Sequence, residues 1–398
     1  MREAVISASS VGGRAEVERM SAPPLAETRV LELGRMLAGP FCGMLLADLG
    51  AEVIKVEPPG GDDARTFGPF VDGASTYYRL LNRNKLGISL DLRRRDQLAV
   101  LRGLLERSDL VVENFRPGAL ERLGLPIADM RSQNPRLVVV SITGFGQDGP
   151  LSNLPAYDLL AQGMSGLMAA TGPVGGGPTR SAVSLGDLVP GLYGALGALC
   201  ALYERERTGL GRHVDVAMLD SLVSLLESVA MRALHSDEAI EPLGNDHALS
   251  APFGAYRTAD GEIAIAIAND PLFVRFSKTL GRPEWPSDLR FATDAERARH
   301  RAELRTEIEA ELAALSSEQA LTRLRDAGIP VGPLLGVREA LEQPQVIARG
   351  MVVSEQDGFR TLGSALKLGD PPRAHRPAPR LGEHQDLIER WLEEPART

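Results

Sequence analysis

The feature that most constrains the fold of this sequence is a strand–helix–strand pattern that begins at Arg29 and then repeats. Short apolar runs rich in Val, Ile and Leu alternate with longer amphipathic segments, and Gly or Pro separates them. Such alternation predicts an α/β fold, in which a Rossmann-like parallel sheet carries helices on both faces and ligands bind at the carboxyl ends of the strands. The expected strands cover residues 29–34, 52–57, 87–92, 109–113 and 136–142, with helices over 40–49 and 95–107 between them.

The later part of the chain changes character twice. After Pro150 the pattern becomes mainly helical, with expected helices over 157–170, 187–207 and 218–234. Around Pro252 it changes to a hairpin, whose turn is Asp260-Gly261, followed by further helices. We therefore expect a smaller α/β domain beside the large one. The predicted division is a variable N-terminal lead-in (1–26), the large domain (27–238), the small domain (239–336) and a C-terminal segment that returns to the large domain (337–398).

Charge, apolar runs and cysteine content limit which partners the protein is expected to bind and in which compartment we expect it. The formal net charge of -9 argues against broad attraction to nucleic acid or to an anionic membrane surface. No uninterrupted apolar run reaches the roughly 18 residues that a membrane span requires. The two cysteines, Cys42 and Cys200, are too few for a disulfide framework or a four-ligand zinc site. These features favour a cytoplasmic protein that binds neither nucleic acid nor membrane.

Common cofactor and nucleophile motifs are absent from the sequence. The first strand–helix turn, Gly34-Arg-Met-Leu-Ala-Gly39, matches neither the dinucleotide pattern G-x-G-x-x-G nor the phosphate-binding P-loop. The six histidines never stand four residues apart, as two metal ligands on one helix face would. Ser165 lacks the spacing of a serine-hydrolase elbow.

Two segments have cations that could meet a phosphorylated ligand. Asn82-Arg-Asn-Lys85 and Arg93-Arg-Arg95 flank an expected strand, where Arg and Lys could hold phosphates; a solvated run of charges is the plainer interpretation. Asn114-Phe-Arg-Pro117 directly follows another strand. Its aromatic ring and guanidinium could cover an adenine, or the segment could be a simple turn with Pro at the first helical position.

Two aspartates stand where helices are expected to begin. Asp187 follows Gly186 and Asp158 follows Tyr157, so each could be a helix N-cap. The chemical alternative for Asp187 is a carboxylate nucleophile that attacks a thioester, with Gly186 letting a bulky substrate approach the backbone.

Seven motifs in this order resemble those of the class III coenzyme A transferases, the family of formyl-CoA transferase and carnitine-CoA transferase, which also includes α-methylacyl-CoA racemase. The resemblance extends from about Val30 to the C-terminus. It rests on Val30-Leu-Glu-Leu33 with Ala38-Gly-Pro40, Leu49-Gly-Ala-Glu-Val-Ile-Lys-Val-Glu57, Asn82-Arg-Asn-Lys85, Val112-Glu-Asn-Phe-Arg-Pro-Gly118, Gly144-Phe-Gly-Gln-Asp-Gly-Pro150, Tyr157-Asp158 and Gly186-Asp187.

The resemblance implies a mechanism and a set of binding residues. Asp187 would be the nucleophile, forming first an aspartyl anhydride and then an aspartyl-CoA thioester while coenzyme A passes to a small carboxylic acid. It implies no permanently bound cofactor, no metal, and a homodimer in which the two chains interlock. The implied coenzyme A contacts are Leu37, Ala38, Leu90, Arg93, Asn114, Phe115, Arg116, Arg122, Ala156 and Tyr157.

Two departures from the family bear on specificity. Leu37 stands where formyl-CoA transferase has a glutamine, which argues against a formate and oxalate enzyme. Tyr157 stands where the racemases have a histidine, and a tyrosine with a pKa near 10 is a poor proton shuttle. Transfer is therefore favoured over two alternatives, an isomerase acting at the α-carbon of an acyl-CoA and a coenzyme A-binding protein without turnover.

Overall fold

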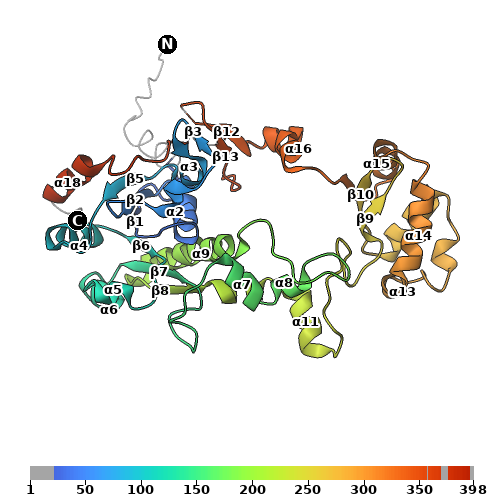
Figure 1. The fold of residues 1–398 in the computed structure, drawn as a ribbon, viewed down its shortest axis with the longest axis horizontal. Helices are drawn as coiled ribbons and strands as arrows, with labels where there is room; N and C mark the ends of the chain where they lie inside the picture. The colour runs from blue at the N-terminus through green and yellow to red at the C-terminus, as the bar shows by residue number, and fades with distance from the viewer. Residues whose placement is uncertain (1–21, 356, 369–374, 395–398) are drawn as a thin grey trace, which may run out of the picture. The chain divides into compact units, whose positions relative to one another are not determined.

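The computed structural model describes residues 22–355, 357–368 and 375–394 (Figure 1). These residues form two compact units. The first contains the described chain as far as Ser165, Ala182–Leu226 and the described residues from Arg349 on; the second contains Gly166–Ser181 and Glu227–Ala348. Compact units need not be independently folding domains, so the predicted limits of 1–26, 27–238, 239–336 and 337–398 stay a prediction.

The first unit is built on a six-stranded sheet in which every neighbouring pair of strands is parallel. Val30 of the central strand pairs with Val53 on one side and Leu110 on the other. The sheet confirms the predicted α/β fold. In spatial order its strands are β5 (Leu86–Ser89), β2 (Glu52–Glu57), β1 (Arg29–Glu32), β6 (Leu110–Glu113), β7 (Val138–Thr143) and β8 (His213–Ala217).

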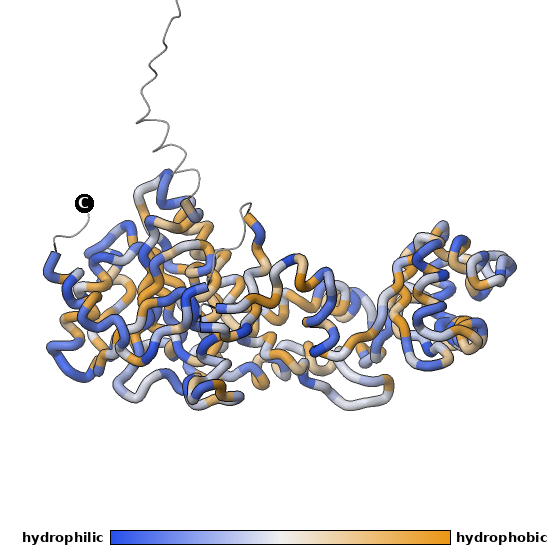
Figure 2. Tube along the Cα trace, turned by 90° about the horizontal axis from the view of Figure 1, so that it is seen from above, coloured by the Kyte–Doolittle hydropathy of each residue, from blue (hydrophilic) through white to orange (hydrophobic). Residues whose placement is uncertain are grey.

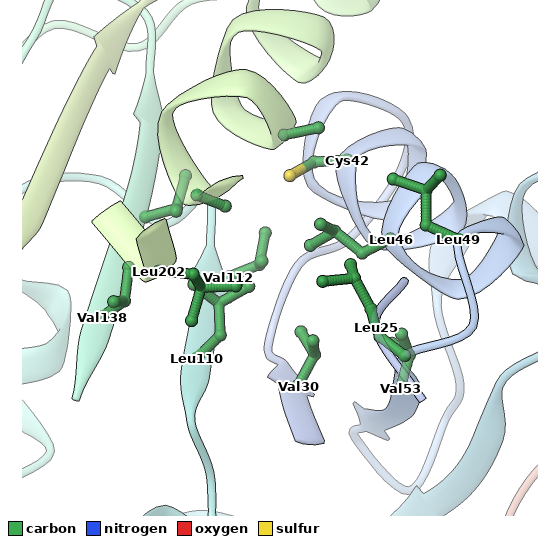
Figure 3. Packing of buried hydrophobic residues seen from close by; sticks show 14 of the residues in the cluster. Leu25, Val30, Cys42, Leu46, Leu49, Val53, Leu110, Val112, Val138 and Leu202 are labelled. Atoms are coloured by element: carbon green, nitrogen blue, oxygen red, sulfur yellow. The ribbon is translucent and has the colours of Figure 1, made fainter. Parts of the chain in front are cut away.

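Helices cover both faces of this sheet because successive strand residues point to opposite sides. On one face, α2 (Ala38–Asp48) and α9 (Leu185–Thr208) pack on Val30, Val53 and Leu110, as Figure 3 shows. On the other face, α4 (Arg95–Glu106) and α18 (Gln385–Glu393) pack on Leu31 and Ile54. Along the chain, apolar residues (orange in Figure 2) alternate with polar ones (blue), as amphipathic elements require.

Helix α9 is long and apolar, and it packs against the core of the first unit. By length and composition alone it could cross a membrane, with a mean hydropathy of 1.5 over its most apolar window. Half of that window is buried inside the protein, and small residues such as Gly194 bring the helix against Ile142 of the sheet. We interpret α9 as a core helix of the first unit.

Further elements of the first unit surround the sheet. Leu25, within the predicted N-terminal lead-in, is buried beneath α2, and its backbone N–H donates to the Leu49 carbonyl. The remaining elements are η1 (Asp63–Thr66), β3 (Phe70–Val71), β4 (Ala74–Ser75), α3 (Thr76–Asn82), α5 (Ala119–Arg122), α6 (Ile127–Gln133), α7 (Asp158–Met164), α10 (Met218–Ser224), β12 (Val352–Ser354) and β13 (Arg360–Leu362).

The second unit has its own core, in which Phe273, Phe276 and Trp285 pack together behind an antiparallel sheet. The sheet order is β11 (Val331–Pro333), β10 (Glu262–Ala266) and β9 (Phe253–Arg257). The helices are α8 (Leu167–Ala170), α11 (Glu227–His235), α12 (Asp270–Leu280), η2 (Trp285–Ser287), α13 (Asp294–Arg299), α14 (Arg301–Leu312), α15 (Ser317–Asp326), α16 (Val337–Glu342) and α17 (Pro344–Ala348).

Two predicted helices are in fact broken, and in both cases the break has a backbone cause. The expected helix over 157–170 is divided between α7 and α8 because Gly166 adopts a φ of 87°. The expected helix over 218–234 is divided between α10 and α11, where Glu227 has a φ of 33°. A residue with positive φ cannot continue a right-handed helix. Both breaks coincide with a change from one compact unit to the other.

Candidate active site

The sequence-predicted binding residues lie near the carboxyl ends of the parallel strands, the edge where α/β proteins bind ligands. Leu37 and Ala38 follow β1, Leu90 follows β5, and Asn114, Phe115 and Arg116 follow β6. Ala156 and Tyr157 lie between β7 and α7. All of these residues belong to the first unit, as does Asp187.

Asp187 lies in the first turn of α9, where the unpaired N–H groups of a helix favour a negative charge. Its interpretation as the helix N-cap is wrong, because α9 begins at Leu185 and Ser184 occupies the N-cap position. The preceding residue, Gly186, is buried and in close contact with Asp158. Asp187 is therefore a helical residue in the first turn of α9, and the first residue of α7 fixes the start of that helix.

Asp158 holds the start of α9 in place. Its Oδ1 accepts hydrogen bonds from the Gly186 N–H at 2.8 Å and from the Gln162 side chain at 2.8 Å. A Cβ on Gly186 would lie only 3.0 Å from Asp158 Oδ1, so the close approach needs glycine. The N-cap interpretation of Asp158 is also wrong, since Tyr157 is the N-cap of α7 and the Asp158 carboxylate reaches a different helix.

The start of α2 lies against α9 one turn beyond Asp187. A Cβ on Gly191 would be 2.9 Å from the Ala38 carbonyl oxygen and 2.9 Å from Phe41. Because residues four apart share one face of a helix, Gly191 and Asp187 lie on the same side of α9. The structure thus brings the first strand–helix turn, with Leu37 and Ala38, to the neighbourhood of Asp187.

Tyr77 is a residue of this neighbourhood that the sequence reasoning missed. Burial, reinforced by the charges of Asp187, Asp62 and Asp158, raises the pKa of Tyr77 to about 12. The hydroxyl is protonated at neutral pH, as in an ordinary tyrosine, and its raised pKa extends this state to higher pH. No local pattern indicates Tyr77, because its electrostatic interaction with Asp187 depends on tertiary packing, in which α3 lies against α2.

The turn before Leu37 is held by side chains from three other segments. Asn114 binds both the N–H and the carbonyl of Arg35, at 2.9 and 3.0 Å. The Asp62 carboxylate accepts from the Met36 N–H at 3.0 Å, and the Lys55 ammonium donates to the Gly34 carbonyl at 2.9 Å.

Buried charges continue beneath this turn. Lys55 lies 2.9 Å from Asp62 and 3.2 Å from Glu32, and all three side chains are almost completely buried. Burial opposes the charge on Lys55, but Glu32 and Asp62 outweigh it and raise its pKa. Lys85, 2.6 Å from Glu32, has its pKa lowered to about 8, because burial and the neighbouring Lys55 outweigh the attraction of Glu32.

Both interpretations of the Asn82–Lys85 cluster are therefore wrong. Arg83 is buried and pairs with Asp48 at 2.6 Å, and Lys85 is buried against Glu32. These cations are neither solvated nor directed at phosphates, because acidic partners from other elements pair with them.

The other predicted binding residues differ in exposure. Leu90 is buried, and Arg93 is 85% exposed and paired with Asp91. Tyr157 is 73% exposed, and Ala156 lies against Gly144, where a Cβ would approach to 2.2 Å. Phe115 packs partly into the apolar cluster under α4, whereas Arg116 and Arg122 are exposed. These placements leave the assignment of coenzyme A contacts a prediction.

A second titratable group lies beside the Asn114–Arg116 segment. Burial raises the pKa of Glu113 to about 7, although the Ser141 hydroxyl and the Phe115 N–H both donate to its carboxylate. Ser141 Oγ in turn lies 3.0 Å from His213 Nε2, so the three side chains form a chain across β6, β7 and β8. Burial also lowers the pKa of His213, which favours the neutral imidazole.

A large open hollow of about 1010 Å³ lies at the other edge of the sheet. It is lined by residues at the amino ends of strands, including Arg29, Glu52 and Asp109, and contains none of the predicted site residues. Arg29 and Arg205 are paired there with Glu52 and Asp109. Arg102 and Arg107, which also line it, donate to backbone carbonyls of the same chain. Among the described residues, no three His, Cys, Asp or Glu side chains form a group that could hold a metal ion.

Comparison with known proteins identifies the family. The sequence model of CoA-transferase family III matches residues 25–385. An acetyl-CoA:oxalate CoA-transferase from Acetobacter aceti is 40% identical over 358 residues, which are 89% of this chain and 92% of that protein. A succinate–glutarate CoA-transferase from Agrobacterium fabrum is 39% identical over 389 residues, 94% of this chain and 97% of that protein.

Solved structures agree with this result. The crystal structure of a CAIB/BAIF family protein from Brucella suis has a TM-score of 0.83 and 37% identity, and the match covers 94% of this chain and all of that one. The resemblance first indicated by the motifs is thereby confirmed. The chain belongs to CoA-transferase family III and is an enzyme of this class.

Proposed function

We propose that this enzyme moves coenzyme A from an acyl-CoA donor to a small dicarboxylic or hydroxy acid, with Asp187 as the covalent nucleophile. The observation that carries the proposal is the place of Asp187 in the first turn of α9, with Gly186 fixed by Asp158 and Ala38 packed one turn further along the same helix. Asp187 is half-buried, and the hydrogen bond from the Gly186 N–H to Asp158 holds the backbone next to it.

The proposed reaction proceeds through two kinds of covalent intermediate. The Asp187 carboxylate attacks the thioester carbonyl, which releases the coenzyme A thiolate and leaves a mixed anhydride. The thiolate then attacks the aspartyl carbonyl, giving an aspartyl-CoA thioester and the free donor acid. The acceptor carboxylate repeats these two steps in reverse order and leaves as its coenzyme A ester, so Asp187 is regenerated.

Groups around Asp187 are suited to the charges that develop in these steps. The α9 N-terminus stabilises the negative charge of the Asp187 carboxylate, which is lost when the anhydride forms and is restored at the end of the reaction. Tyr77, whose phenol is protonated at neutral pH, would supply a neutral donor for an oxyanion. Leu37, which is buried, favours a less polar acyl pocket than a glutamine would.

The proposed acceptor class rests on the relatives. The names of the two relatives include oxalate in one case and succinate and glutarate in the other, all short dicarboxylates. The presence of Leu37 argues against oxalate for this chain, so we propose an acceptor with an apolar spacer between its carboxylates, as glutarate has.

We also propose that the enzyme is a homodimer. Four side chains on one face of α9, namely Leu192, Tyr193, Leu196 and Tyr203, are between 39% and 71% exposed in the single chain. The adjoining helix α7 adds Leu159, Leu160 and Met164, which are also exposed. An apolar surface of this kind is typical of a protein–protein interface. Because the family that the motifs resemble forms interlocked dimers, we propose that a second copy of this chain covers this surface. We also propose a cytoplasmic location.

The proposal is tested by following coenzyme A transfer from acetyl-CoA or succinyl-CoA to oxalate, glutarate and a hydroxy acid. Asp187→Ala should abolish transfer, lowering kcat by about 10⁴-fold or more because no nucleophile remains. Asp220→Ala is the matched control: Asp220 also lies in the first turn of a helix, α10, and is exposed. An unchanged transfer rate in Asp187→Ala would overturn the proposal.

Two other outcomes would favour the alternative activities. Exchange of the α-proton of an acyl-CoA in deuterated water, without any acceptor acid, would indicate an isomerase. Tight binding of coenzyme A, combined with no reaction of any acyl-CoA in the panel, would indicate a binding protein.

A further inference from the structure

We propose that Asn114 and Asp62 are positioning residues, which hold the turn Gly34–Leu37 so that Leu37 stands against the acyl group beside Asp187. The inference rests on the proposed function. It differs from the expectation drawn from the family resemblance, in which Asn114 contacts coenzyme A, because it assigns the Asn114 side chain to the protein's own backbone.

Both polar atoms of the Asn114 amide bind one residue, Arg35. Its Oδ1 accepts from the Arg35 N–H and its Nδ2 donates to the Arg35 carbonyl, so the side chain binds both backbone polar groups of this residue. The side chain also packs closely, because a Cβ on Gly39 would lie 3.3 Å from its Cγ and Oδ1. These two bonds fix the position of the Asn114 amide, and each of its polar atoms keeps the capacity for one further bond.

Asp62 holds the next residue of the turn. Met36 has a φ of 64°, a left-handed conformation that a non-glycine residue adopts only at a cost in free energy. Asp62 stabilises this conformation by accepting from the Met36 N–H, and Lys55 fixes Asp62 through an ion pair of 2.9 Å. The Asp62 side chain is 1% exposed and that of Lys55 is fully buried, so this support is rigid.

The turn held in this way leads directly to the candidate reaction centre. Leu37 is buried at its end, and the next carbonyl, that of Ala38, lies against Gly191 of α9. Asp62 and Asp187 both contribute to the raised pKa of the Tyr77 phenol, which agrees with this arrangement.

Two separate supports therefore define the position of Leu37. The Ala38 end is fixed by helix packing of α2 on α9, whereas the Arg35–Met36 end is fixed by Asn114 and Asp62. Loss of Asn114 should loosen only the second end. Misplacement of a group at a reaction centre by about 1 Å can cost on the order of 100-fold in rate.

The test compares Asn114→Ala with a matched control at the opposite edge of the sheet. Asn134 also binds two backbone groups, accepting from the Arg136 N–H and donating to the Ser108 carbonyl, but it is remote from the site. Three quantities are measured for each variant: hydrogen exchange of the Arg35 and Met36 amides, the dissociation constant of coenzyme A, and the single-turnover rate of Asp187 acylation.

For Asn114→Ala we expect faster exchange at the two amides and acylation slowed by about 10- to 100-fold, with the dissociation constant of coenzyme A changed less than about threefold. Asn134→Ala should match the wild type in all three. The reverse pattern, a weakened affinity for coenzyme A with unchanged acylation, would show Asn114 to be a ligand and would overturn the inference. Equal acylation rates in the wild type and Asn114→Ala would also overturn it.

Asp62→Asn provides a second variant that keeps an acceptor for the Met36 N–H while removing the charge. We expect intermediate acylation rates and partial protection of the Met36 amide; wild-type behaviour in both would remove Asp62 from the proposal. Failure of the proposed function is recognised separately, since it would appear as absence of Asp187 modification in the wild-type enzyme itself.

Discussion

At the scale of single residues, the carboxylates of this enzyme have different tasks because their surroundings differ. Asp187 stands at a helix start, Asp158 is occupied by the Gly186 N–H, and Asp62 is buried in an ion pair. Glu113 is buried beside the Asn114–Arg116 segment without a cationic side chain among the groups that shift its pKa, which is why that pKa rises to about 7.

The raised pKa of Glu113 has a consequence for stability. The unfolded chain would release this proton near its ordinary pKa of 4.5, whereas the folded chain keeps it until about pH 7. Folding therefore binds a proton between these values, so the contribution of Glu113 becomes less favourable as the pH rises from about 4.5 to 7. The span corresponds to about 3 kcal/mol in the free energy of unfolding.

Glu113→Gln should remove this dependence. Relative to the wild type, we expect the variant to gain stability progressively as the pH rises from 5 to 8, measured by urea unfolding at several pH values. Glu121→Gln is the control, since Glu121 is an exposed neighbour on α5. A stability difference between Glu113→Gln and the wild type that does not vary with pH would contradict the account.

At this scale, sequence patterns indicate a role only for residues that belong to a chemical motif. Asp187 was singled out as a possible nucleophile, and its role stays a proposal. Arg83 and Lys85 were misread, because their partners Asp48 and Glu32 are distant in sequence and local charge patterns do not show such pairs. No sequence pattern indicates Tyr77 either, because the residues that surround it are distant in sequence.

At the scale of elements, the packing of α2 on α9 connects the first turn to Asp187. Gly191 allows this approach, since any Cβ there would meet the Ala38 carbonyl at 2.9 Å. Parallel strands and the helices between them were predictable because hydrophobic periodicity is local. The breaks at Gly166 and Glu227 were not, since the hydrophobic pattern that predicts a helix does not show a positive φ at a single residue.

Gly191→Val should force the two helices apart. We expect a loss of about 1–3 kcal/mol in the free energy of unfolding from overpacking, together with a loss of transfer activity larger than partial unfolding explains. Gly103→Ala on α4 is the control, because the added methyl would meet only the flexible end of Leu392, at 3.1 Å. Full activity in folded Gly191→Val would contradict the role of this contact.

At the scale of the whole molecule, the exposed apolar face of α9 is the feature that a single chain leaves unexplained. Light scattering after size exclusion should give twice the chain mass of 42.7 kDa. Leu196→Glu should reduce the dimer fraction, because it places a charge in the proposed interface. Leu289→Glu, at an 86% exposed leucine of the second unit, should not. A monomeric wild-type protein would contradict the proposed dimer.

The central claim, covalent catalysis by Asp187, is tested most directly by trapping. The enzyme is incubated with an acyl-CoA, quenched with hydroxylamine and analysed by peptide mass spectrometry. The account expects a hydroxamate at Asp187, dependent on the acyl-CoA, and none at the neighbouring carboxylates Asp158 and Asp62. Consumption of the thioester by transfer, with Asp187 unmodified or with the label on another residue, would contradict it.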